Sequence, residues 1–142
     1  MGDVWTKIRQ VPPTARALDG GAWLITVPNL PPSLNEWQRM HWTKRYQETK
    51  ELCLSIWGLA QQNRIPRFEH AECACRYFFP IARVRDSPNY HYWKSLWDAL
   101  VRAGILRADD IRHLHVSEPA LLVDRERPRS EITIHPVPPP AE

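Results

Sequence analysis

Three aspartates flank one predicted helix, with one acid before it and two adjacent acids after it. Asp86 ends the basic segment RVRD, whereas Asp109 and Asp110 follow the turn after the helix. Magnesium prefers hard oxygen ligands, usually carboxylates, and leaves positions for water and a phosphate oxygen. If both ends of the helix lie at one edge of a sheet, the three carboxylates converge. We therefore predict that Asp86, Asp109 and Asp110 bind Mg²⁺, with Mn²⁺ as the substitute ion.

Positive charge is gathered in two segments of the chain. The formal net charge is +3 and the pI is about 8.9, which is compatible with a polyanionic partner without requiring one. The clustering is more informative, because binding to successive phosphates needs neighbouring cations. The residues that we expect to contact DNA are Arg39, Lys44 and Arg45 in the first segment and Arg83 and Arg85 in the second.

The spacing of apolar residues predicts a small sheet covered by helices. Ser33 and Glu36 have the S-x-x-E form of a capping box, and no proline interrupts the chain from there to Arg64, so one helix is expected over residues 33–64. A second helix should end near Gly104. Strands are expected at residues 22–27, 73–79, 114–116, 121–123 and 131–134. This order predicts an α/β (α+β) fold: a small mixed β-sheet of about four to five strands with two main helices packed on one face.

The chain has the size of one domain. Its 142 residues with 43% hydrophobic content can bury a core. Residues 22–135 are expected to form this domain, between a flexible N-terminal arm (1–21) and a Pro-rich C-terminal tail (136–142). No apolar run suits a membrane span or a secretory signal, so we expect a cytoplasmic protein without a membrane partner. The three cysteines include no CxxC pair and are expected to be buried thiols.

The tryptophans and histidines each allow two interpretations. Trp57, Trp93 and Trp97 fall on apolar helical stripes and are expected in the core, while Trp37 and Trp42, set among basic residues, are the tryptophans expected to face DNA. The histidines of the HLH segment (113–115) share one face of a strand. Two such histidines can bind zinc, although outward polar positions are the preferred interpretation.

The stretch RVRDSPNYHYWKSLWDALVRAGILRADD (83–110) resembles the central signature of the RusA-type Holliday-junction resolvases. In that signature an R-D-x-D-N element is followed by a helix reading K-x-x-x-D-A-L, then a glycine and an acidic pair. Upstream, PPSLNEWQRMHW resembles the entry to the family's domain, with Asn35 and Arg39 at its polar positions. The residues that match the central signature are Asp86, Asn89, Lys94, Asp98, Gly104, Asp109 and Asp110.

This resemblance implies a structure-selective, Mg²⁺-dependent endodeoxyribonuclease of bacterial or phage origin. Such a homodimer would resolve Holliday junctions or related branched DNA by paired symmetric nicks, in recombination or repair. The catalytic residues would be Asp86, Asp109, Asp110 and Lys94, and Asn89 would join the DNA-binding residues. The metal would lower the pKa of a bound water, while Lys94 would stabilise the charge that develops on the phosphate.

The sequence departs from the signature at two points. Pro88 stands where the second aspartate of R-D-x-D-N is found, and the spacing from Asn89 to Lys94 is two residues longer. The alternative is therefore a catalytically impaired DNA-binding or interaction protein that retains the same fold. A third interpretation is a domain of similar fold that acts on RNA.

Overall fold

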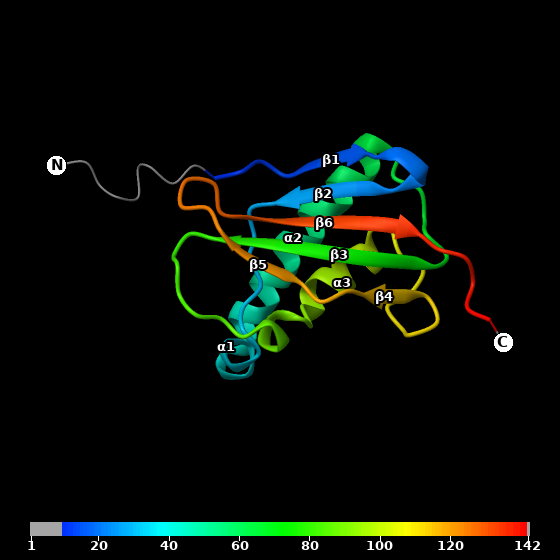
Figure 1. The fold of residues 1–142 in the computed structure, drawn as a ribbon. Helices are drawn as coiled ribbons and strands as arrows, with labels where there is room; N and C mark the ends of the chain where they lie inside the picture. Colours follow the sequence, from blue (N-terminus) through cyan, green and yellow to red (C-terminus); the bar gives the residue numbers. More distant parts are fainter. Residues whose placement is uncertain (1–9, 142) are drawn as a thin grey trace.

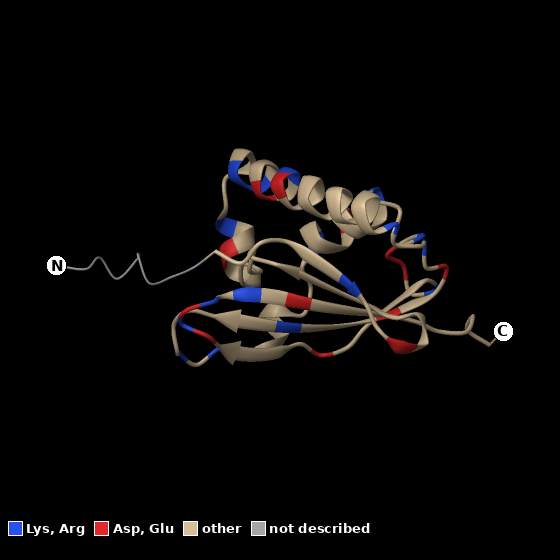
Figure 2. Cartoon of the chain, turned by 90° about the horizontal axis from the view of Figure 1, so that it is seen from above, with Lys and Arg blue, Asp and Glu red and all other residues tan. Residues whose placement is uncertain are grey.

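The fold is built on one six-stranded mixed sheet, seen in a computed structural model that describes residues 10–141 (Figure 1). Two long helices pack together on one face of this sheet, as Figure 2 also shows from above. The predicted α+β class is therefore confirmed. The strands are β1 (Thr14–Ala17), β2 (Trp23–Val27), β3 (Ala71–Phe79), β4 (Leu114–Val116), β5 (Ala120–Val123) and β6 (Arg129–Pro136).

Strand β3 lies at the centre of the pairing that positions the candidate site. The strands β1, β2, β6 and β3 are joined in this order by antiparallel pairing. Along its other side, β3 pairs in parallel first with β4, where Ala71 faces Leu114, and then with β5, where Arg76 faces Ala120. The short segment 117–119 separates β4 from β5, so this edge of the sheet is interrupted halfway.

The single helix expected over residues 33–64 is two helices, α1 (Leu34–Arg39) and α2 (Trp42–Asn63). The predicted capping box is present, since Ser33 and Glu36 exchange side-chain to backbone hydrogen bonds. The chain is extended at Met40 and His41, and the His41 ring accepts a hydrogen bond from the backbone N–H of Thr43. This cap satisfies a donor at the start of α2 and so stabilises the start of a second helix. The break between the two helices contains no proline or glycine that would mark it in the sequence.

The boundary predicted at residue 21 is wrong for the residues just before it. Residues 14–17 form β1, which pairs along its length with β2, and a short 3₁₀ helix, η2 (Asp19–Gly21), connects the two. Pairing with the edge of β2 orders a segment whose own composition carries little strand signal. The remainder of the predicted flexible arm, residues 1–9, lies outside the described residues. At the other end, regular structure stops at Pro136.

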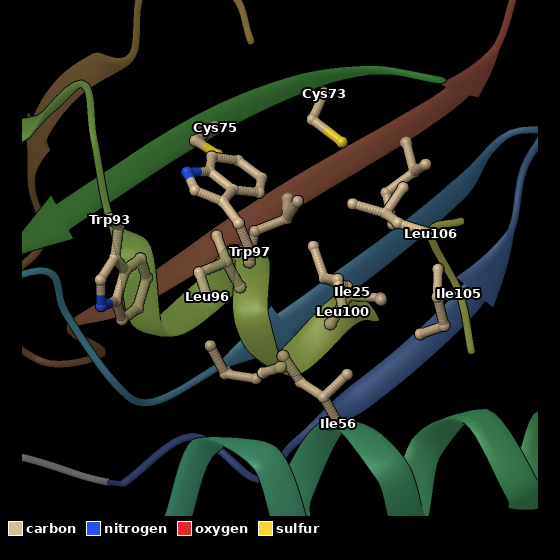
Figure 3. Close-up of a cluster of buried hydrophobic side chains, with 14 of the residues drawn as sticks. Ile25, Ile56, Cys73, Cys75, Trp93, Leu96, Trp97, Leu100, Ile105 and Leu106 are labelled. Carbon is tan, nitrogen blue, oxygen red and sulfur yellow. The ribbon is translucent and has the colours of Figure 1, made fainter. Parts of the chain in front are cut away.

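The core is formed where α3 (Lys94–Arg102) lies between α2 and the sheet (Figure 3). Trp97 points from α3 towards β3, and Ile56 points from α2 towards Leu100. Trp93 and Trp97 are buried, as predicted, but Trp57 is 54% exposed and the prediction that it is core is wrong. It follows the fully buried Ile56 directly and points about 100° away from it around α2, on a side of this helix that the sheet and α3 do not cover.

The cysteines are unpaired. Cys73 and Cys75 on β3 are buried as predicted, but Cys53 on α2 is only half-buried. Burial raises the pKa of the Cys75 thiol to about 11 and that of Cys73 further, so both remain protonated at neutral pH. None of the helices within residues 10–141 combines the length and the apolar composition needed to cross a bilayer.

Candidate functional site

Helix α3 separates the acids that the sequence predicted to share a metal ion. Asp86 lies after β3, at the start of the 3₁₀ helix η3 (Ser87–Tyr90) that precedes α3, whereas Asp109 and Asp110 follow α3 and precede β4. The nine residues of α3 alone span about 13 Å. Within residues 10–141, no group of three or more His, Cys, Asp or Glu side chains is arranged to hold a metal ion. The predicted convergence of the three acids is therefore not found within one chain.

The loop that carries Asp86 leaves its side chain exposed and free. In the described part of the chain this carboxylate accepts no hydrogen bond, although the Asp86 backbone carbonyl accepts one from the Asn89 N–H (3.0 Å). Arg83, three residues before Asp86, is also exposed. Arg85 is held in place, because its guanidinium lies 4.0 Å from the centre of the Phe79 ring and donates to the carbonyl of Ile81 (2.9 Å). The loop thus carries one unengaged carboxylate and two cations.

A second carboxylate, Glu118, lies next to this loop. Ser87 Oγ donates a hydrogen bond to Glu118 Oε1 (2.6 Å), which links the residue after Asp86 to the interruption between β4 and β5. Oε2 of Glu118 accepts no hydrogen bond from the described residues. Magnesium is commonly held by one or two carboxylates together with waters and substrate phosphates. The donors of Asp86 and Glu118 therefore have the chemistry that Mg²⁺ requires.

Sequence reasoning missed Glu118 because it is 31 residues from Ser87. The available signal was local: an acidic residue directly before Pro119, at the end of one short strand and before another. Proline ends strand pairing, and side chains at strand ends are those that a loop presents to solvent. That signal locates an exposed acid but does not reveal its partner across the sheet edge.

Lys94 opens α3 and is exposed. It makes no ion pair with the acids of residues 10–141, and it lines a pocket with Trp37 of α1 and with Tyr92. Asn89 lies in η3, half-buried, one turn after Asp86. The segment that leads into α3 therefore carries Asp86, Asn89 and Lys94. Of these residues, Lys94 is a cation that makes no ion pair with the described residues.

The acidic pair at the other end of α3 has a different environment. Asp110 Oδ1 accepts hydrogen bonds from His113 Nδ1 (2.6 Å) and from the backbone N–H of Arg112 (3.0 Å). The hydrogen bond from His113 is the main reason why the pKa of Asp110 lies below its usual value. His113 in turn stacks on His70, with ring centres 5.4 Å apart and planes 2° apart. Both aspartates are exposed, but Asp110 organises the turn before β4 through these hydrogen bonds.

The two histidines of the HLH segment have different surroundings. His115 is exposed on β4, in agreement with the outward prediction, while His113 is half-buried in the turn with Asp110. His70 Nδ1 donates to the carbonyl of Arg112 (2.8 Å). The part of the chain that the structure describes holds no zinc-type cluster around either residue of the pair.

The basic residues predicted to contact DNA form two separate groups. Arg39 and Lys44 line an open pocket at the corner between α1 and α2. Arg45 is tied to α1, since it donates to the carbonyl of Gln38 (2.9 Å) and lies 5.1 Å from the centre of the Trp37 ring. Figure 2 shows basic and acidic residues interleaved along the first half of α2. The other group, Arg83 and Arg85, lies on the Asp86 loop.

A scan against protein-family models finds no match for this chain, and a search of curated proteins finds none either. Function is therefore inferred from the residues and from their arrangement.

Proposed function

We propose that this protein is a Mg²⁺-dependent endodeoxyribonuclease of the crossover-junction type. It would cut Holliday junctions or related branched DNA by paired symmetric nicks, as a homodimer in the cytoplasm of a bacterial or phage-infected cell. The observation that carries the proposal is the loop after β3, which carries the free carboxylate of Asp86 together with Arg83 and Arg85, and whose Ser87 is hydrogen-bonded to Glu118. An exposed carboxylate on the same loop as two cations suits a site that binds both a metal ion and a phosphate.

Each residue in and around this loop would have a different role in such a reaction. Asp86, with Glu118 beside it, would hold Mg²⁺, which supplies a bound water of lowered pKa and neutralises charge on the phosphate. Arg83 would contact a neighbouring phosphate, because it is exposed. Lys94, free at the start of α3, would stabilise negative charge that develops during cleavage.

The separation of Asp86 from Asp109 and Asp110 is compatible with this proposal if the protein is a two-fold dimer. A two-fold axis brings the surface of one protomer against that of its partner, so groups from the two ends of α3 can meet across the interface. Asp86 of one protomer would then approach the acidic pair of the other. Paired sites related by this axis would also suit a DNA junction of approximate two-fold symmetry.

The substitution Asp86→Asn tests the metal site. It should reduce the rate of Mg²⁺-dependent nicking of a four-way junction by about 10²-fold or more, as expected when a main electrostatic contribution to catalysis is lost. Junction binding in EDTA, measured by gel shift, should remain. Unchanged nicking by Asp86→Asn would contradict the proposed nuclease.

Mixed dimers test where the acidic pair acts. Asp86→Asn and Asp109→Asn protein are each made inactive, mixed, and allowed to exchange subunits. If sites form between protomers, the mixed dimer contains one site with both acids intact, so single nicks return. If sites lie within one protomer, every site carries a substitution and nicking stays absent. Full activity of Asp109→Asn alone would show that the acidic pair has no part in the reaction.

A second function has its own support. Pro88 replaces an acid of the signature, and α3 keeps the remaining acids apart in one chain. These two facts favour a protein that binds branched DNA without cutting it. Labelled four-way, flap and linear duplexes, incubated with Mg²⁺ or Mn²⁺, separate the two functions: binding with no product in either metal would favour the second.

A further inference from the structure

The outer face of α2 carries large aromatic side chains that the fold leaves exposed. Trp42 is 71% exposed, Tyr46 60% and Trp57 54%. Their spacing places them on one flank of the helix, next to the stripe that buries Leu52 and Ile56. Figure 2 shows that α2 forms the outer layer of the molecule, so no other element covers this side. Burial would normally remove such rings from water, so a run of three exposed ones indicates a binding surface.

A basic groove lies beside these aromatic residues. It runs between α2 and α3, and its lining includes Tyr46, Lys50, Leu54 and Arg102. Arg45 and Trp37 close one end, with the guanidinium of Arg45 over the ring. No acidic residue lines the groove, although Asp98 lies one turn before Arg102 on α3 and is half-buried. The groove therefore combines aromatic surface with cations on both of its walls.

We propose that this surface, consisting of Trp42, Tyr46, Lys50, Trp57 and Arg102, binds single-stranded DNA. Unpaired bases would stack on the three rings, and Lys50 and Arg102 would contact the phosphates. This inference rests on the proposed function, because branched DNA offers unpaired strands where its arms part. Aromatic rings and neighbouring cations are the two features by which proteins hold single strands without sequence preference. Bases stacked within a duplex cannot use the rings in this way.

The charges argue against a second copy of the chain as the occupant. In a two-fold dimer that used this face, the same groove would meet itself. Lys50 and Arg102 would then face a lining that holds cations and no acid, and like charges brought together oppose association. A polyanion with exposed bases complements both the charge and the aromatic character of the surface.

Fluorescence anisotropy with a labelled oligo(dT) tests this inference on the full chain. Because stacking of one base is worth about 1–3 kcal/mol, Tyr46→Ala should weaken binding by roughly 5- to 150-fold. Tyr46→Phe should retain binding, since it keeps the ring. Tyr92→Ala is the matched control, because Tyr92 is equally exposed at 60% but does not line the groove. Lys50→Ala should lower the slope of log affinity against log salt.

Two substrates distinguish failure of this inference from failure of the proposed nuclease. A four-way junction with blunt, fully paired arms reports on cutting, and oligo(dT) reports on the α2 surface. Tyr46→Ala should bind oligo(dT) poorly while nicking the fully paired junction normally. Wild-type affinity of Tyr46→Ala and Trp57→Ala for oligo(dT) would overturn the inference. The inference would also be overturned if these variants bound oligo(dT) with unchanged affinity while analytical ultracentrifugation showed that they dissociate a dimer.

Discussion

The two ends of α3 differ in how far the protein itself uses their polar groups. At the start of the helix, Asp86 and Lys94 are exposed and take part in no ion pair with the described residues. At its end, Asp110 is engaged by His113 and by the backbone of Arg112. Groups whose hydrogen bonds are already satisfied stabilise a turn, whereas free groups remain available to a ligand. The comparison shows that the Asp86 carboxylate is available to a ligand, as the proposed function requires, whereas Asp110 is engaged in the turn.

The largest expected effect comes from the buried middle of α3, which holds the two ends in place. Trp97 is 1% exposed, and its replacement by alanine should lower the free energy of unfolding by about 3–5 kcal/mol in urea titrations. The indole Nε1 has no hydrogen-bond partner among the described residues, so the loss should be near the lower value. Trp57→Ala, on the exposed side of α2, should change stability by no more than about 0.5 kcal/mol. Equal losses in both variants would contradict the layering of the core.

The next effect sharpens the contrast between the acids at the two ends. Glu118→Gln removes the charge that is hydrogen-bonded to Ser87, the residue after Asp86, and should weaken the apparent Mg²⁺ affinity in nicking assays by about 10- to 100-fold, the cost typical of lost support at a metal site. Excess Mg²⁺ should restore part of the rate. Glu126→Gln, an exposed acid in the turn between β5 and β6, is the matched control. Normal Mg²⁺ dependence in Glu118→Gln would remove Glu118 from the site.

A smaller effect should follow from Ser87→Ala, which releases Glu118 from the loop. A single hydrogen bond contributes about 0.5–1.5 kcal/mol, so nicking should slow by roughly 2- to 10-fold. The bond from Ser117 Oγ to Glu72 Oε1 (3.2 Å) is similar in kind and lies nearby on the sheet edge. Ser117→Ala is therefore the control, with activity expected to be unchanged. An equal loss in both variants would indicate a general loosening of the edge.

The smallest expected effect concerns Asp110 and acid stability. The pKa of Asp110 is held below its usual value by His113, so the ionised acid stabilises the fold above the ordinary pKa of about 4, and this contribution is lost as the pH falls through the lowered value. The Asp110→Asn variant lacks the ionisable carboxyl group and therefore lacks this pH-dependent contribution. Thermal unfolding between pH 2.5 and 6 (a range set around that ordinary pKa) should show a slightly shallower acid dependence for the variant. Superimposable profiles would mean that Asp110 does not serve the turn.

Local signals predicted much of the fold. The capping box at Ser33 and Glu36 and the glycine after α3 were identified from the sequence, and Gly104 has the positive φ (77°) that favours glycine at a helix end. Strand β1 was missed because Thr14–Ala17 becomes a strand through its pairing with β2. The break at His41 was missed because its cap is a ring nitrogen, which local patterns do not announce.

The candidate site was harder to predict than the fold. Sequence spacing correctly placed Asp86 before α3 and the acidic pair after it, but spacing carries no information on which sheet edge each end reaches. The structure answers this through register: Leu114 pairs with Ala71 at the start of β3, whereas Asp86 follows the end of the same strand. Glu118 comes beside Ser87 only because β5 starts against Arg76, in the second half of β3.

The interruption between β4 and β5 also affects how molecules of this protein can meet. An unbroken outer strand would offer a regular row of N–H and C=O groups to any passing extended chain, the usual origin of runaway sheet growth. Here that row is cut at Pro119, which has no N–H to donate. The same short gap that presents Glu118 therefore also protects the protein from aggregation along this side.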